Sequence, residues 1–279
     1  MEDRKYGLKE LQPDDRDFAL GAAFDLPKLE DLPQEFLLGV PKVEHQANSD
    51  FCAAFASCYL SELQENEDFE ASWTFAKSKE LSGDPAEWGQ DLRTIMKTHQ
   101  KFGALKKEDS PYSLKEKDET FLRHIEKWPE LKDKAEPFKK KSYFKVVGRY
   151  DDFDNIRAAI YKFREEKQGV ILGLLWGWPI DQVNLDAVPY SGFGHAVACL
   201  GWAVRNGEQK LVIINSYGTE AGESGLHYVS RGVINMFASK YGAFMMVDMP
   251  DNMGKDEIQW RSKYFSAPFW KRWLMAIFS

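Results

Sequence analysis

The chain has 279 residues, a formal net charge of −7 and a pI near 5.4, and 43% of its residues are hydrophobic. A chain of this length and composition can bury a sizeable core, in one large domain or in two lobes. The acidic balance argues against a nucleic-acid partner, because phosphate backbones are bound by clustered Lys and Arg, and the one basic run, 139–141, is typical of a solvated loop or helix.

The N-terminus and the cysteines bear on the cellular compartment. Residues 1–6 lack the apolar core of a secretory signal, and the longest apolar stretch, 170–180, is much shorter than a membrane span. The cysteines are odd in number and have no framework spacing; they are Cys52, Cys58 and Cys199. We therefore expect a reducing compartment, most simply the cytoplasm, with non-secretory release or incorporation into a viral or multiprotein particle as alternatives.

The predicted elements form a helical half followed by a β-rich half. Apolar side chains after Asp50 recur with the helical period, Asp50 is expected to cap that helix, and Gly103 stands where a later helix should end. Downstream, apolar or alternating runs separated by Gly, Asn and Pro are typical of strands. The predicted helices are 50 onward, 73–80, 90–102 and 153–167, and the predicted strands are 143–147, 169–175, 195–202, 210–214 and 225–229.

This pattern divides the chain into four segments. Residues 1–40 are rich in Asp, Leu and Pro and predict an extended strap. Residues 41–140 are the helical lobe with a charged insertion, and 141–254 are the β-rich lobe. Residues 255–279 predict an aromatic, amphipathic C-terminal tail. We expect the tail to pack on the protein's own core, with docking to a protein partner or assembly, or to a membrane surface, as the alternatives.

Separated segments carry the residue types that acyl transfer needs. Cys52 opens an apolar helix, and the partial positive charge of a helix N-terminus lowers a thiol pKa. His195 lies on one predicted strand and Asn215 at the end of the next, so adjacent strands can pair the imidazole with an orienting amide. The backbone N–H of Cys52 and the side-chain amide of Gln46 can donate to an oxyanion. Each residue alone is more typical of a structural role, but the combination favours a nucleophile, a base, an orienter and an oxyanion donor.

These residues and their local sequences resemble the papain-like cysteine peptidase family over most of the chain. The most specific match is 215–231, Asn-Ser-Tyr-Gly-Thr-Glu-Ala-Gly-Glu-Ser-Gly-Leu-His-Tyr-Val-Ser-Arg. Residues 88–91 resemble the glycine-containing loop that pairs with the substrate backbone, and 110–112 resemble the family's Tyr-Pro-Tyr. The segment 13–17, followed by Leu-Pro at 32–33, resembles short-leader bacterial and viral members.

The resemblance implies an α+β, papain-like two-lobe fold, with a helical lobe, an antiparallel β-barrel-like lobe and the active-site cleft between them. It implies hydrolysis of a peptide or protein substrate through a thioacyl intermediate on Cys52, with His195 as base and acid, Asn215 as orienter and Gln46 in the oxyanion hole. The implied substrate-binding residues are Asp50, Trp88, Gly89, Gly194 and Tyr217. The leader is too short for the inhibitory helical module of many members, but it can occupy the cleft or cross the back of the β-rich lobe.

The chain departs from the family pattern next to the nucleophile and next to the orienter. Ser-Asp-Phe at 49–51 precedes Cys52 where the family usually has Cys-Gly-Ser before the nucleophile, and Ala53 follows it in place of Trp. Tyr217 replaces the Trp that shields the His–Asn hydrogen bond, so we expect that bond to be more exposed to water. The Asp50 carboxylate predicts a mild preference for a basic residue before the scissile bond.

Two other functions stay open. The chain can be a catalytically weak or inactive papain-like module in a larger assembly, including a viral one, or a related transpeptidase, deamidase or isopeptidase. Metal and cofactor chemistry has little support, because the sequence has no Cys-x-x-Cys pair and no glycine-rich phosphate loop. The histidines outside the proposed site are dispersed without metal-ligand spacing; they are His45, His99, His124 and His227.

Overall fold

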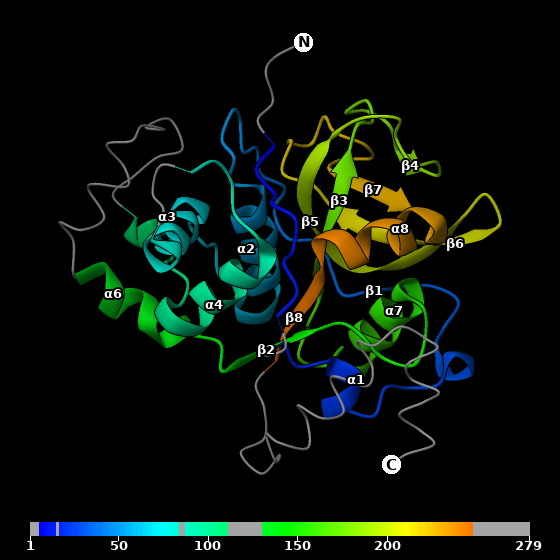
Figure 1. Cartoon of the computed structure of the whole chain (residues 1–279), viewed down its shortest axis with the longest axis horizontal. Helices are drawn as coiled ribbons and strands as arrows, with labels where there is room; N and C mark the ends of the chain where they lie inside the picture. The colour runs from blue at the N-terminus through cyan, green and yellow to red at the C-terminus, as the bar shows by residue number, and fades with distance from the viewer. Residues whose placement is uncertain (1–5, 15–16, 84–86, 111–129, 248–279) are drawn as a thin grey trace.

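The structure is a computed structural model that describes residues 6–14, 17–83, 87–110 and 130–247 (Figure 1). The predicted tail, 255–279, lies outside the described residues, as do Pro111 and Tyr112 of the Ser-Pro-Tyr motif and most of the charged insertion. No helix of the described chain is long and apolar enough to cross a membrane.

The helical half is built around one buried helix. The described helices of this half are α2 (Cys52–Glu65), α3 (Ala71–Ser82), α4 (Leu92–Phe102) and the short α6 (Glu130–Ala135). Helix α2 is buried along its first eleven residues, 52–62, and packs against α3, α4 and the strands β3 and β5. The predicted helices at 73–80 and 90–102 are confirmed, and Gly103, with φ 76°, is the C-cap of α4.

The predicted cap of the first helix is wrong. Phe51 is the N-cap of α2, and no side chain caps it. Instead, the Asp50 carboxylate accepts a hydrogen bond from the backbone N–H of Gly89 at 2.6 Å. Asp50 therefore ties the start of α2 to the loop before α4, which a pattern of neighbouring residues could not indicate.

The β-rich half is one mixed sheet with two helices. The strands are β1 (Phe36–Leu37), β2 (Ser142–Lys145), β3 (Val170–Trp176), β4 (Asn184–Leu185), β5 (Phe193–Arg205), β6 (Glu208–Ile214), β7 (Leu226–Val229) and β8 (Ala243–Val247), and the helices are α7 (Asp152–Lys162) and α8 (Arg231–Tyr241). The five predicted strands are confirmed, and the predicted helix 153–167 is present as α7 but ends at Lys162. Sequence reasoning missed α8 and β8, although Val233, Ile234, Phe237 and Ala238 of α8 follow a helical period and are buried.

The predicted α+β fold, with a helical half and a mostly antiparallel β-rich half, is confirmed, and the sheet of the β-rich half is open. Among the described strands the order is β2-β8-β3-β5-β6-β7-β4, with β1 paired to β5, so β2 and β4 are separate edges. The pairing of β4 with β7 is parallel, while the other strand pairs are antiparallel. Closing a barrel requires edge strands that pair with each other, and the two-residue β4 offers too few backbone groups for this.

The segment before α2 crosses both halves of the molecule. Its start runs between the helices and the sheet, where Leu8 forms a parallel bridge with Gln90 (Figure 1). Further along, the short helix α1 (Leu20–Ala23) is mostly buried, and β1 adds to the edge of β5. Leu8, Leu11 and Leu20 of the strap are thus part of the hydrophobic core that the described residues form.

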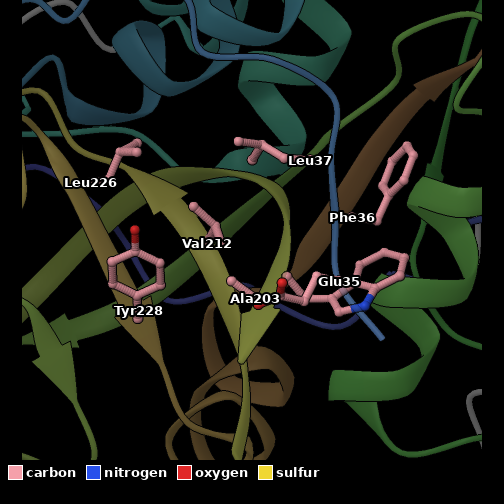
Figure 2. A pocket seen from close by; sticks show the side chains of 8 residues that line it. Glu35, Phe36, Leu37, Ala203, Val212, Leu226 and Tyr228 are labelled. Atoms are coloured by element: carbon pink, nitrogen blue, oxygen red, sulfur yellow. The ribbon is translucent and has the colours of Figure 1, made fainter. Parts of the chain in front are cut away.

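An apolar depression of about 330 Å³ lies where β1 meets β5, β6 and β7 (Figure 2). Its lining residues are Glu35, Phe36, Leu37, Trp202, Ala203, Val212, Leu226 and Tyr228. It contains none of the side chains that the sequence analysis proposes as catalytic or substrate-binding.

A neutral histidine is buried between α4 and α2. The Nε2 atom of His99 lies 2.9 Å from the Ser57 hydroxyl, which itself donates to the carbonyl of Ala54, and Nδ1 has no hydrogen-bond partner. Burial, helped by the charge of Lys140, lowers the pKa of His99 from 6.5 to about 3. The folded protein therefore holds His99 in its uncharged form.

We expect this burial to make the protein less stable in acid. The pKa of His99 is lower in the folded state than in the unfolded state. The contribution of the neutral ring to the free energy of unfolding is therefore complete above the unfolded pKa near 6.5 and is lost as the pH falls toward 3. Between about pH 6.5 and pH 4.5 the loss should be about 2–3 kcal/mol. Urea unfolding at both pH values measures it, and His99→Gln should remove this part of the pH dependence. An unchanged pH dependence in His99→Gln would contradict the assignment.

Candidate active site

The four proposed catalytic residues come from four places in the fold and are all fully buried. Cys52 is the first residue of α2, His195 lies on β5 and Asn215 follows the last residue of β6. Gln46 lies in the loop before α2, and its backbone N–H donates to the carbonyl of Ser216 at 2.8 Å. Their exposed fraction is 0%, so the site is closed to solvent in this structure.

The imidazole of His195 has a defined tautomer. Its Nε2 lies 2.8 Å from the Asn215 Oδ1, which also accepts a hydrogen bond from the Ser216 backbone N–H at 2.8 Å. An amide oxygen can only accept, so Nε2 must carry the proton and Nδ1 must carry the lone pair in the neutral ring. Nδ1 is therefore the atom that can take a proton from a thiol.

Tyr217 covers the histidine. Its ring stacks on the imidazole of His195 with centroids 4.8 Å apart, and its hydroxyl lies 3.3 Å from Nδ1. Trp176 packs edge-on at 5.2 Å from the imidazole. Tyr217 is 1% exposed, so the prediction that the His–Asn hydrogen bond is more open to water is wrong for this closed arrangement.

Gln46 joins the two halves just before Cys52. Its Nε2 donates to the Ser49 carbonyl at 2.8 Å, and its Oε1 accepts from the Ser216 hydroxyl at 2.5 Å. These bonds hold the amide rigidly beside the start of α2, and the NH₂ group carries two N–H donors.

Residues 6–9, which we call the strap segment, occupy the space between the helical half and the sheet at the site. The carbonyl of Gly7 accepts from the Gln90 backbone N–H at 2.7 Å, and the Leu8 N–H donates to the Gly194 carbonyl at 3.1 Å. Lys9 extends this pairing with a backbone bond to the Gln90 carbonyl at 3.2 Å. The strap segment therefore lies between the two halves beside Cys52, while β1, further along the strap, pairs with β5 of the β-rich half.

Three glycines let the backbones meet in this region. A Cβ on Gly7 would lie 2.0 Å from the carbonyl oxygen of Asp50. A Cβ on Gly89 would lie 2.1 Å from the Gly7 carbonyl oxygen, and one on Gly194 would lie 2.2 Å from that of Leu8. Any side chain at these positions would require the strap segment or its neighbours to move.

Aromatic side chains hold the first residue of the strap segment. The Tyr6 ring stacks on Phe193 with centroids 5.2 Å apart and meets the His195 ring edge-on at 5.9 Å. The Trp88 indole N–H donates to the Tyr6 carbonyl at 2.6 Å. Trp88, Gly89 and Gly194 thus contact the strap segment in the places where the resemblance implies substrate contacts.

The closed site holds the Cys52 thiol and the His195 imidazole in their uncharged forms. Burial raises the pKa of the Cys52 thiol to about 11, although backbone groups of Ala196 and Gly7 lower it in part. Burial also lowers the pKa of His195 to about 4, against the opposite effect of the bond to Asn215. Among the described residues, no hydrogen bond joins the Cys52 thiol to His195. A thiol beside a neutral imidazole is the unreactive state of such a pair.

Solved structures decide the fold. No family model matches the chain, and no curated protein does. The structure is similar to xylellain, a cysteine protease from Xylella fastidiosa, with a TM-score of 0.71 and 17% identity over 89% of this chain and 98% of that one. The chain has the papain-like fold. It is also similar to procathepsin L2 from the Tenebrio molitor larval midgut, with a TM-score of 0.62 and 14% identity over 89% and 79% of the two chains, and to bromelain from Ananas comosus, with 0.55 and 16% over 76% and 98%.

Within this papain-like fold the sequence analysis missed three contributors to the site. His227 on β7 contacts Asn215, Trp176 on β3 packs against His195, and Tyr6 of the strap segment reaches the same ring. The sequence did place residue 227 on a strand directly after the Asn215 segment, so pairing of those two strands was a usable signal. The described residues contain no group of three His, Cys, Asp or Glu side chains that could hold a metal ion.

Proposed function

We propose that the chain is a cysteine peptidase that its own strap segment keeps latent. The observation that carries this proposal is the hydrogen-bonded pair of His195 and Asn215 beside Cys52, whose thiol contacts the backbone of Ala196, the residue next to His195. The Nε2–H tautomer leaves the Nδ1 lone pair for the thiol proton, as nucleophilic catalysis by cysteine requires.

The proposed reaction has two halves. His195 Nδ1 takes the Cys52 thiol proton, and the sulfur attacks the peptide carbonyl carbon; the oxyanion accepts hydrogen bonds from the Cys52 backbone N–H and the Gln46 amide. The peptide C–N bond then breaks, and protonated His195 gives its proton to the leaving amine. In the second half, His195 takes a proton from water, and the resulting hydroxide attacks the thioester carbonyl carbon. The C–S bond then breaks, and protonated His195 returns the proton to the Cys52 sulfur. Asn215 keeps the imidazole oriented through both halves.

The proposed substrate is a peptide or protein that replaces the strap segment. The substrate backbone would then lie against Trp88, Gly89 and Gly194, because these residues contact the backbone of the strap segment in the closed site. Asp50 holds the N–H of Gly89, so we place its carboxylate behind the substrate loop; the preference for a basic residue stays a prediction. Tyr217 would remain over His195 and shield it.

The closed site also favours one alternative, a papain-like module kept for binding or assembly. Its support is the uncharged thiol–imidazole pair, which a protein without catalytic function could keep. A transpeptidase, deamidase or isopeptidase would use the same residues with another acceptor or substrate.

The first test is covalent labelling. Full-length protein and its Cys52→Ala and His195→Ala variants are incubated near neutral pH with a peptide vinyl sulfone and analysed by intact mass. Each substitution is made both in the wild-type chain and in the Gly7→Ala chain, in which the strap segment should be displaced. We expect one label, slow in the wild type, that is lost with Cys52→Ala and falls by at least about 100-fold with His195→Ala.

The other outcomes separate the candidate functions. Cys58 and Cys199 are fully buried internal controls, so a label on either would indicate unfolding. A well-folded protein that stays unlabelled in both backgrounds would contradict the peptidase and favour the binding module. Product analysis with peptide substrates then distinguishes hydrolysis from transfer to an amine.

A further inference from the structure

His227 lies against the far side of the proposed catalytic pair. It is on β7, in register with Ile213 of β6, and its ring is fully buried. The His227 Nε2 is 3.3 Å from the Asn215 Nδ2, and its Nδ1 is 2.7 Å from the backbone carbonyl of Gln182. Asn215 is thus contacted by His195 through its oxygen and by His227 through its nitrogen.

A main-chain carbonyl defines the proton positions along this series. The Gln182 carbonyl can only accept, so the His227 Nδ1 carries a proton, and in the neutral ring Nε2 is the acceptor. Burial lowers the pKa of His227, which favours this neutral form. The Asn215 Nδ2–H then donates to His227, and the Asn215 oxygen is left to face His195 Nε2.

The surroundings leave His227 little freedom to turn. Trp176 packs edge-on against the rings of both His227 and His195, with centroids 5.0 and 5.2 Å away. On another side, a Cβ on Gly222 would lie 2.8 Å from the ring, so only glycine permits this contact. The ring is therefore held by its carbonyl partner and by packing.

We propose that His227 is a positioning residue, which sets the amide orientation of Asn215 and through it the proton position on His195. This inference rests on the proposed peptidase function. Without an acceptor at Nε2 of His227, only the Ser216 N–H, which donates to the Asn215 oxygen at 2.8 Å, still opposes a turn of the amide, and the amide can then present its NH₂ group to His195. The imidazole would then need its lone pair at Nε2 and its proton at Nδ1, which is the tautomer that cannot take the thiol proton.

The test compares removal of the acceptor with its replacement. His227→Leu removes the acceptor, and His227→Gln restores an amide oxygen that can accept from Asn215. In full-length protein labelled with ¹⁵N-histidine, the ring-nitrogen shifts of His195 report which nitrogen carries the proton, and they need no activity. We expect the wild type and His227→Gln to hold the proton on Nε2, and His227→Leu to show the Nδ1–H form or a mixture. His99→Leu is the matched control, because it removes another buried histidine and should leave His195 unchanged.

Rates in the Gly7→Ala background provide the second readout. We expect His227→Leu to slow labelling of Cys52 by at least about tenfold, and His227→Gln to restore most of the parent rate. In the double variant, His227→Leu should slow labelling little beyond the effect of Asn215→Ala, because both substitutions act through the Asn215 amide. An unchanged His195 tautomer, or full additivity with Asn215→Ala, would overturn the inference while leaving the peptidase proposal intact. Absence of labelling in the parent variant would instead contradict the peptidase, and the His195 shifts would still decide the role of His227.

Discussion

The Gly7→Ala variant of the full chain should expose Cys52 to electrophiles. A Cβ at position 7 would lie 2.0 Å from the Asp50 carbonyl oxygen and 2.7 Å from its carbon, which are backbone atoms at the start of α2 and cannot turn aside. Overpacking of this kind costs about 1–3 kcal/mol, so the balance between covered and open forms should shift about 5- to 150-fold. The rate of labelling by the peptide vinyl sulfone should rise by the same factor.

A matched glycine provides the control for this prediction. Gly232 lies in α8, and a Cβ there meets nothing within 4 Å, so Gly232→Ala should leave the labelling rate unchanged. Circular dichroism and the urea midpoint confirm that both variants remain folded. Equal labelling of Gly7→Ala and the wild type would mean that the strap segment does not limit access to Cys52 in solution.

Sequence patterns indicated those residues of the candidate site whose place depends on local order. The start of an apolar helix indicated Cys52, and a strand followed by an Asn-Ser segment indicated His195 and Asn215. These positions need only the right residue type on the right element, and the fold then brings them into one buried cluster.

Contacts between distant segments could not be predicted in this way. The strap segment fits because Gly7, Gly89 and Gly194 meet from three parts of the chain, and a glycine in isolation does not indicate which backbone approaches it. For the same reason the local sequence predicts Asp50 as the cap of its own helix, whereas its partner is the Gly89 N–H, 39 residues away. His227 has no metal-ligand spacing that would single it out, yet from the neighbouring strand β7 it contacts Asn215, which follows β6.

The strap is also held to the helical half by a buried ion pair outside the catalytic cluster. Arg93 of α4 donates from Nε to Oδ1 of Asp17 at 2.7 Å and from a terminal nitrogen to Oδ2 at 2.5 Å, and it also donates to the Gln12 carbonyl at 2.8 Å. The two side chains are only 10% and 6% exposed. These three hydrogen bonds hold Gln12 and Asp17, which follow the strap segment, against α4.

Breaking this pair should lower stability and open the site together. Asp17→Ala leaves a buried guanidinium without its carboxylate, so we expect the free energy of unfolding to fall by about 3 kcal/mol, the lower end of the range for such a loss. Labelling of Cys52 should rise as well, because the strap segment loses its anchor. Urea unfolding and the vinyl sulfone rate measure the two effects on the same samples.

Two further variants show whether the effect of Asp17→Ala comes from the Asp17–Arg93 pair itself or from the loss of any charge in the strap. Glu10 of the same strap forms an exposed ion pair with Lys240 of α8. Glu10→Gln removes this pair and should lower the free energy of unfolding by less than about 1 kcal/mol. In the double variant Asp17→Leu/Arg93→Met both charges are absent, so no charge stays buried and unpaired, and stability should return toward that of the wild type. If Asp17→Ala destabilised the protein but left labelling unchanged, the anchor would stabilise the fold without controlling the strap segment, and latency would depend on the contacts of Tyr6, Gly7 and Leu8 alone.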